Sequence, residues 1–521
     1  MSWNDGYRTD LTYTYGYYNE INPACMRFVL LMAGLVPPDV NSACELGYGQ
    51  GISLNIHAAA ETVKWWGTDF NPSQAAFARE MAQISGAHCL AESFQNLVSI
   101  PDLPEFEYIA LHGIWSWISP QNRDAIVRFI DKKLAVGGVV YISYNTSPGW
   151  YPFRPLRDLM KLHVDTHGGT GTSVLDRISN AMEFAQKFIE LKPGYVNAYP
   201  AAGKRMEFFT DKDAHYLAHE LFNDDWETTS FAEMNAALGE ARLSLASSAS
   251  PLGVIPGLGL SAEQRAFVND LKDPVLAESV MDFIYNTQFR KDYWIKGPRR
   301  LSGVARNSAL RDEQFILLAP MTDIGRQIKT NMGDITISEG AHAVITQVMK
   351  DGKIHSAAEL EKMSQQLAAR ETAPKGMEAE NLQALLHAML VLIAGGLAAP
   401  VQKKAEITKA RPVTDKLNFL LCQRAIDSGD IAFLASPVTG GGIRVSRFYQ
   451  LFLLAIKRGA RSPEVMAAFA RDCLSAANQY VVVEGKTITD PHETLQYLQN
   501  QAETFMTASL PLLKNLQVVQ A

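Results

Sequence analysis

The chain has 521 residues, too many for one hydrophobic core, so we expect roughly two to four domains. Apolar residues make up 47% and charged residues 20%, which is typical of a folded globular protein and not of a disordered or fibrous one. The net charge is −7 and no Lys/Arg cluster exceeds a few residues, which argues against a nucleic-acid partner.

The sequence also predicts where the protein resides. No apolar run reaches the length of about 20 residues that a membrane-spanning helix needs, so we expect no membrane insertion. The first ten residues, MSWNDGYRTD, lack the basic start and apolar stretch of a signal peptide. The five cysteines are scattered without CxxC spacing, which fits a reducing cytoplasm and disfavours a zinc site. We therefore expect a cytoplasmic protein without a structural metal.

Strand and helix patterns alternate over the first 150 residues, which indicates an α/β domain with a parallel sheet. The expected strands are 42–46, 63–68, 88–91, 108–112 and 139–144. The expected helices between them are 24–34, 52–61, 72–85 and 122–134. Such a domain would be Rossmann-like, with ligands bound at the carboxyl ends of its strands.

The later residues have mainly helical patterns. Residues 161–325 are predicted to form a middle domain, and residues 326–521 a C-terminal domain, after a first domain over 1–160. A helix, turn, helix and hairpin after residue 330 are compatible with a winged-helix-like unit. Because its second helix has no basic surface, we favour interaction or packing over nucleic-acid binding for this unit.

A glycine-rich loop follows the first expected strand. The segment CELGYGQG (44–51) places Gly47, Gly49 and Gly51 at alternate positions after Glu45, so its backbone can turn tightly and approach a bulky ligand. The dinucleotide fingerprint GxGxxG would need glycine at position 52, which is Ile52. The loop therefore predicts a nucleotide-like ligand other than NAD, with Tyr48 beside it.

Further candidate ligand contacts follow the next three strands. Asp69 lies twenty residues after Gly49, where a carboxylate can accept hydrogen bonds from both ribose hydroxyls. The neighbouring Phe70 can lie against adenine, and Asn71 is a candidate helix N-cap. The remaining candidates at these strand ends are Ser93 and Phe94 after the third strand, and His112 and Gly113 after the fourth.

These residues resemble the class I S-adenosylmethionine-dependent methyltransferases, and more narrowly the bacterial members with an appended methyltransferase regulatory domain. The resemblance rests on YTYGYY (13–18), ACELGYGQGISLNIHAAA (43–60), WGTDFNPSQAAFAR (66–79), LPEFEYIALHGIWSWIS (103–119), GGVVYISYNTSPGW (137–150) and FRKDYWIKG (289–297). It is strong over the first ~160 residues and weak beyond. The rickettsial protein-lysine methyltransferases that act on outer-membrane protein B have a similar layout.

The resemblance implies a mostly parallel seven-stranded sheet and the cofactor S-adenosyl-L-methionine, with S-adenosyl-L-homocysteine as product. It implies that Glu45 and the three glycines surround the methionine half of the cofactor, and that Asp69 holds the ribose. It also favours a protein substrate methylated on lysine side chains, and the protein could form a homodimer.

Aromatic residues gather near the expected acceptor side, where rings can wall a channel and stabilise a cationic amine. Tyr13, Tyr15, Tyr17 and Tyr18 precede the first helix, and either form an arm packed on the domain or wall the channel. The candidate catalytic residues are Tyr15, Trp115, Asn145 and Trp150. A small-molecule methyltransferase and a non-catalytic cofactor-sensing protein remain alternatives to a lysine methyltransferase. Closure of the mouth by residues 13–18 would favour a small acceptor.

Overall fold

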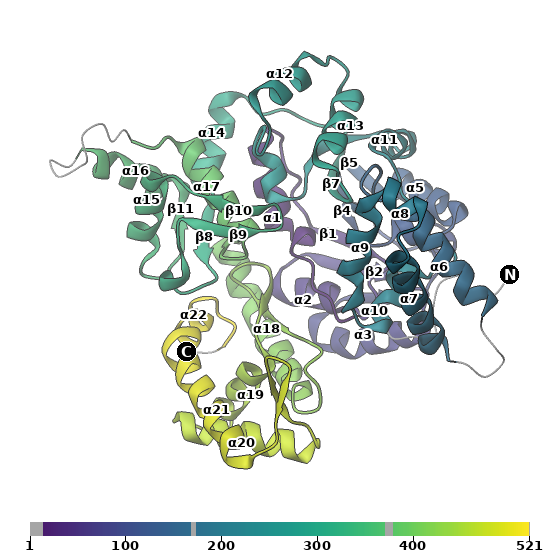
Figure 1. Cartoon of the computed structure of the whole chain (residues 1–521). Helices are drawn as coiled ribbons and strands as arrows, with labels where there is room; N and C mark the ends of the chain where they lie inside the picture. The colour runs from purple at the N-terminus through teal and green to yellow at the C-terminus, as the bar shows by residue number, and fades with distance from the viewer. Residues whose placement is uncertain (1–13, 168–172, 370–378, 520–521) are drawn as a thin grey trace.

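A seven-stranded sheet forms the centre of the computed structural model, which describes residues 14–167, 173–369 and 379–519 (Figure 1). In spatial order its strands are β3 (His88–Leu90), β2 (Lys64–Thr68), β1 (Ser42–Leu46), β4 (Phe106–Leu111), β5 (Leu134–Asn145), β7 (Phe289–Lys296) and β6 (Leu243–Ser248). β1 to β5 pair in parallel, and β7 runs antiparallel to both of its neighbours. The expected mostly parallel seven-stranded sheet is therefore confirmed.

Helices cover both faces of this sheet. The helices are α1 (Pro23–Met32), α2 (Ile52–Ala60), α3 (Pro72–Ser85), α4 (Phe94–Leu97), α5 (Pro120–Lys133) and α11 (Phe231–Glu240). One apolar cluster packs α1, α2 and α3 on one face, and another packs α5 and α11 on the other. Because the central strands are buried on both faces, their sequences are nearly continuous apolar runs.

Local sequence signals set where three of these helices begin. α1, α3 and α5 start with proline, preceded by Asn22, Asn71 and Ser119, respectively. Each of these three side chains accepts a hydrogen bond from a backbone N–H of the first turn. An N-cap acceptor followed by proline is a strong helix-start signal, and it confirms the predicted cap at Asn71.

A helical unit is inserted between β5 and α11. It consists of α6 (Arg154–Thr166), α7 (Val174–Glu190), α8 (Gly194–Ala198), α9 (Pro200–Thr210) and α10 (Ala214–Leu221). The chain then returns to the sheet through α11 and β6, and reaches β7 after α12 (Ala262–Asp270) and α13 (Pro274–Tyr285). Two strands of the sheet thus come from within residues 161–325, the range that the sequence assigns to a middle domain.

A smaller unit follows α14 (Gly303–Asp312). Its three-stranded antiparallel sheet consists of β11 (His355–Ser356), β8 (Gln314–Leu317) and β12 (Ala398–Pro400). The unit also contains the hairpin β9 (Gln327–Thr330) and β10 (Gly333–Thr336) and the helices α15 (Glu339–Met349), α16 (Ala357–Ala368) and α17 (Leu382–Ala394). A single strand, β12, follows α17, where the winged-helix hypothesis expects a hairpin.

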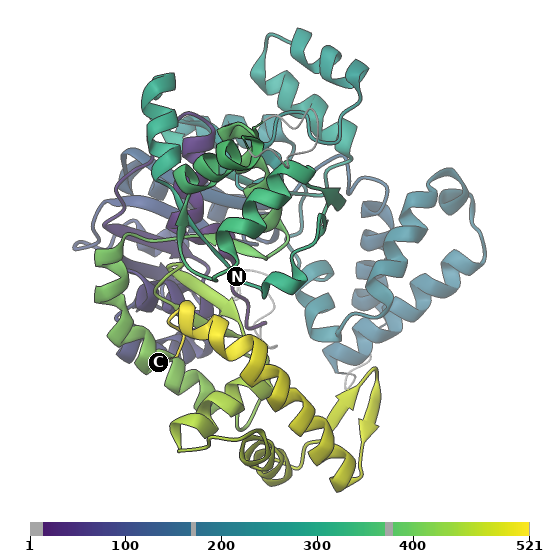
Figure 2. The same cartoon turned by 90° about the vertical axis from the view of Figure 1, so that its left-hand side faces the viewer.

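The last part of the chain forms what we call the C-terminal unit, residues 404–519. It consists of α18 (Lys404–Arg424), β13 (Phe433–Ser436), β14 (Gly441–Arg444), α19 (Arg447–Lys457), α20 (Pro463–Ala476), β15 (Val481–Val483), β16 (Lys486–Ile488), α21 (Pro491–Thr504) and α22 (Leu510–Asn515). Figures 1 and 2 show it below the sheet, in green and yellow.

The C-terminal unit packs on the first domain through α18, which lies against α2 and α3 (Figure 1). One apolar cluster joins Ile52 and Ile56 of α2 to the core of the C-terminal unit. At its edge, Arg424 forms an ion pair with Glu80 of α3 at 2.5 Å. Within the described residues, no helix has the length and apolar character that crossing a membrane requires.

Candidate cofactor site

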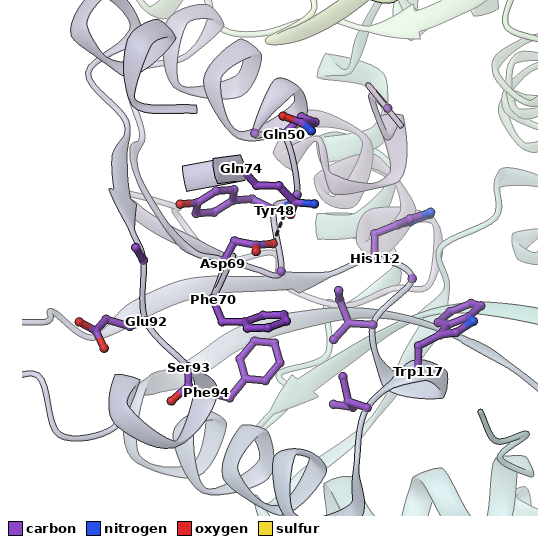
Figure 3. A pocket seen from close by; sticks show the side chains of 18 of the residues that line it. Tyr48, Gln50, Asp69, Phe70, Gln74, Glu92, Ser93, Phe94, His112 and Trp117 are labelled. Atoms are coloured by element: carbon purple, nitrogen blue, oxygen red, sulfur yellow. Dashed lines mark hydrogen bonds between the residues drawn. The ribbon is translucent and has the colours of Figure 1, made fainter. Parts of the chain in front are cut away.

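A cavity of about 240 Å³ lies at the carboxyl ends of β1 to β4 (Figure 3). All of the residues that line it belong to the range 14–122. Ten of the residues predicted from the sequence line this cavity: Gly47, Tyr48, Gly49, Gly51, Asp69, Phe70, Ser93, Phe94, His112 and Gly113.

The loop between β1 and α2 requires glycine at its alternate positions. Gly47, Gly49 and Gly51 have φ angles of 71°, 56° and 70°, in the left-handed region that side-chain-bearing residues rarely adopt. A Cβ at Gly47 would also overlap the side chain of Ile114, and one at Gly51 would lie 2.6 Å from the Cβ of Ala78. The loop backbone can therefore come close to a ligand in the cavity.

Asp69, directly after β2, is bound to this loop. Its Oδ2 accepts a hydrogen bond from the amide of Gly49 at 2.9 Å, and its Oδ1 accepts one from the amide of Asn71 at 2.9 Å. Burial raises the pKa of the Asp69 carboxyl to about 6, although both hydrogen bonds oppose the rise. Each carboxylate oxygen keeps a second lone pair for a ligand hydroxyl.

Glu45, at the end of β1, lies beneath the loop and does not line the cavity directly. Its Oε2 is buried and has no hydrogen-bond partner within the described part of the chain. Burial, and secondarily the charge of Asp69, raise the pKa of the Glu45 carboxyl to about 8. A buried acceptor without a partner is unfavourable unless a ligand or water satisfies it, so Glu45 fits a ligand that brings a hydrogen-bond donor, such as an amino group.

Two aromatic rings lie side by side in the cavity. Figure 3 shows the rings of Phe70 and Phe94 next to each other, below Asp69. They offer a flat apolar surface of the kind that binds adenine. The side-chain oxygens of Asn71 and Ser93 instead cap α3 and α4, and of these two residues Ser93 lines the cavity and Asn71 does not.

His112 closes the other end of the cavity. Its Nδ1 lies 2.7 Å from the hydroxyl of Tyr141, and its ring stacks on Tyr18 with 3.7 Å between ring centroids. The amide of the next residue, Gly113, donates to Ser143 Oγ at 2.9 Å. Burial lowers the pKa of His112 to about 4, so the imidazole is neutral at physiological pH.

The four predicted catalytic residues do not line the cavity. Tyr15 packs edge-on against Phe77 of α3, and Trp115 is buried in the apolar cluster that packs α5 and α11 on the sheet. Asn145 is buried with its Nδ2 unpartnered among the described residues, and its backbone N–H donates to Ser116 Oγ at 2.8 Å. Trp150 lies in the core of the helical unit, where Arg205 covers its ring at 4.3 Å. Tyr13 lies outside the described residues.

Several lining residues are not among the candidate cofactor-binding and catalytic residues, although Tyr18 belongs to the tyrosine run predicted either to pack as an arm or to wall the channel. They are Tyr18, Gln50, Gln74, Ile114 and Trp117, together with Thr14, Gly16, Ile52, Ala91, Glu92, Asn96, Ile118 and Asn122. Gln50 lies inside the glycine loop, and Gln74 lies in the first turn of α3. Both could have been predicted as lining residues because they lie next to motifs that the sequence identifies. Of the two tryptophans after β4, Trp117 faces the cavity and Trp115 the core; their spacing alone does not distinguish them.

Part of the chain matches the sequence model of a protein family. Residues 213–296 match the model described as "predicted methyltransferase regulatory domain". This region begins near the start of α10 and ends with β7, so it includes both strands that complete the seven-stranded sheet.

Relatives and solved structures extend the comparison. The chain is 34% identical to the Synechocystis protein sll1526, covering 99% of this chain and all of that protein. It is 30% identical to the Rickettsia prowazekii protein RP789 over 52% of this chain and 49% of that protein. The solved structure of PKMT2 from Rickettsia typhi in complex with AdoHcy has a similar fold, with a TM-score of 0.68 and 17% identity over 97% of this chain and 99% of that one.

Proposed function

Because the chain belongs to the class I S-adenosylmethionine-dependent methyltransferases that carry a methyltransferase regulatory domain, we propose that it methylates lysine side chains of a bacterial outer-membrane or surface protein. The main observation in favour of a methyltransferase is the glycine loop, which is hydrogen-bonded to Asp69 at the carboxyl edge of the sheet. The lysine acceptor is supported by the resemblance to rickettsial protein-lysine methyltransferases and by the acidic net charge, which suits a basic substrate.

The residues in the cavity fit the parts of this cofactor. Asp69 would accept hydrogen bonds from the ribose hydroxyls, and Phe70 with Phe94 would hold the adenine. The unpartnered oxygen of Glu45 would lie toward the amino group of the methionine half. When bound, the cofactor supplies a methyl group on a sulfonium, which is an intrinsically good leaving group.

The chain itself must then orient the acceptor and let it lose a proton. A lysine amine has a reference pKa of about 10.4, so its neutral form costs roughly 4–5 kcal/mol at pH 7. A desolvated aromatic surface lowers that pKa. Tyr18, His112 and Trp117 provide such a surface, and the neutral His112 adds no charge to it.

Incubation with labelled S-adenosylmethionine and a bacterial outer-membrane protein fraction tests the proposal. We expect label on proteins, with mass increments on lysine in peptide mass spectra, and no label with the Asp69→Ala variant. Label found only on small molecules would contradict the lysine acceptor. Cofactor binding without turnover on any acceptor would instead favour a cofactor-sensing protein.

One observation favours a small-molecule acceptor as the second candidate. Thr14, Gly16 and Tyr18 form part of the cavity wall, and the later domains contribute no lining residue among those described. A cavity lined only by the first domain suits a small acceptor molecule that fits entirely inside it. The same labelling experiment, run with a small-molecule extract, separates this candidate from the protein acceptor.

A further inference from the structure

The segment before the first helix has two sides that contact different parts of the molecule. We call residues 14–18 the N-terminal arm. Thr14, Gly16 and Tyr18 line the cofactor cavity, whereas Tyr15 and Tyr17 pack against the apolar cluster that contains the core of the C-terminal unit. The arm therefore lies between the cavity and a unit that begins almost 400 residues later in the sequence.

Tyr17 occupies a seat between two elements. Its ring lies 5.2 Å from the ring of His57 in α2 and 5.3 Å from that of Phe433 in β13. Its hydroxyl is buried and has no hydrogen-bond partner in the part of the chain that the structure describes. Packing of the ring therefore holds Tyr17 between α2 and β13.

The far side of this seat is a glycine turn, residues 439–442, at the start of β14. A Cβ at Gly442 would lie 2.9–3.0 Å from three ring atoms of Tyr17, and these are the three atoms nearest to it. A Cβ at Gly441 would overlap the Tyr17 hydroxyl. Neither glycine has a positive φ, so the contact with Tyr17, and not the backbone conformation, is what requires glycine here.

Buried hydrogen bonds join the same turn to the first domain. Asn22 Nδ2 donates to the carbonyl of Thr439 at 2.9 Å, and His57 Nδ1 donates to the carbonyl of Gly440 at 3.2 Å. Next to the turn, Gln402 Nε2 donates to the carbonyl of Ala60 in α2 at 2.7 Å. The glycine turn is therefore held against α2, the helix that begins at the cofactor loop.

The residue after Tyr17 reaches the cavity. Tyr18 stacks on His112 at 3.7 Å, and its amide donates to Ser53 Oγ in the first turn of α2 at 3.4 Å. A Cβ at Gly16 would lie 2.6 Å from the Tyr18 hydroxyl, so glycine at that position allows the ring to fold back over the arm. Because Tyr17 and Tyr18 share a peptide bond, a backbone shift that releases the Tyr17 ring would also move Tyr18.

We propose that the glycine turn of the C-terminal unit positions the N-terminal arm, so that Tyr17 and Gly442 act as positioning residues for Tyr18 at the cofactor cavity. This inference rests on the proposed function in so far as the cavity must bind the cofactor. It assigns the C-terminal unit a part in completing the cofactor site, independent of which acceptor is methylated.

Substitutions at the seat should change cofactor affinity. In full-length protein, Gly442→Ala pushes the Tyr17 ring out of its seat, and Tyr17→Ala removes the ring. For each we expect the Kd of S-adenosylhomocysteine to rise about tenfold or more. Tyr17→Phe keeps the ring and should retain more than half of the affinity. Because the three atoms nearest to the new methyl group at 442 all belong to Tyr17, the double variant Tyr17→Ala/Gly442→Ala should bind no more weakly than Tyr17→Ala alone.

Calorimetric titration with S-adenosylhomocysteine tests this, with Gly303→Ala as the matched control, since a Cβ there meets no atom within 4 Å. Near-wild-type affinity of Gly442→Ala and Tyr17→Ala would overturn the inference while leaving the proposed function intact. Additive losses in the double variant would also overturn it, because they would mean that Gly442 acts without Tyr17. Absence of binding by the wild-type protein would overturn the proposed function and this inference with it.

Discussion

The carboxylate of Asp69 accepts a hydrogen bond at 2.9 Å from the amide of Gly49, so the end of β2 is tied directly to the glycine loop that follows β1. The other oxygen of Asp69 accepts from the amide of Asn71. The residue predicted to hold the ribose therefore also holds the loop that approaches the cofactor. Loss of this carboxylate should affect both tasks at once.

Replacing Asp69 with asparagine should weaken cofactor binding strongly. An amide offers one oxygen, so its NH2 group would face either the amide of Gly49 or that of Asn71, donor against donor. We expect a loss of about 1.5–3 kcal/mol, or roughly 10- to 100-fold in Kd. Titration of Asp69→Asn with S-adenosylhomocysteine measures this. An unchanged Kd would show that Asp69 does not contact the cofactor.

Cofactor binding should also depend on pH through Asp69. Burial raises the pKa of its carboxyl to about 6, so the group gains a proton as the pH falls through that value and loses acceptor capacity. Adenosine contains the ribose but not the methionine half, so its binding isolates Asp69 from Glu45. We expect the affinity for adenosine to fall between pH 7 and pH 5. A flat profile over this range would contradict the assignment.

Glu45 should lower the stability of the cofactor-free protein as the pH rises. Its pKa is raised from 4.5 to about 8, so between these values the folded state holds a proton that the unfolded state releases. The free energy of unfolding therefore decreases from about pH 4.5 to pH 8. Glu45→Gln removes this dependence and should be more stable than wild type at pH 8, measured by thermal unfolding without cofactor.

The same substitution should weaken binding of S-adenosylhomocysteine, because a neutral amide cannot pair with the amino group of the methionine half. Stability and affinity would then move in opposite directions. A Glu45→Gln variant that lost stability at pH 8 would show that the buried carboxylate has a partner that satisfies it.

Trp150 provides a test of a catalytic role against a packing role. It is fully buried in the helical unit, with its Nε1 donating to the carbonyl of Gln288 at 2.8 Å. Trp150→Ala should destabilise the protein by about 3–5 kcal/mol through the cavity it leaves. We expect the affinity for S-adenosylhomocysteine to remain near that of wild type at temperatures where the variant is folded. A loss of activity without loss of stability would instead support the predicted catalytic role.

The cofactor-binding residues could be predicted from the sequence because each motif that indicates them lies within a short segment of the chain. The glycine spacing, the position of Asp69 and the Asn–Pro start of α3 each lie within one strand–loop–helix segment, and the structure brings them to one cavity. Strand β1 and helix α3 occupy the expected residues for the same reason.

The rest depends on contacts between distant residues, which one sequence does not reveal. The antiparallel strand β7 and its neighbour β6 complete the sheet from within residues 161–325, and the glycine turn meets Tyr17 across more than 400 positions. Aromatic density alone did not distinguish residues that line the cavity from core residues. Trp115 and Trp150 are core residues, whereas Tyr18 and Trp117 reach the cavity.

The most direct test of the central claim is a crystal structure of this protein with S-adenosylhomocysteine. The account predicts the ribose hydroxyls within hydrogen-bond distance of Asp69, the adenine against Phe70 and Phe94, and the amino group of the homocysteine near Glu45. Binding at another site, or a ribose placed away from Asp69, would contradict it.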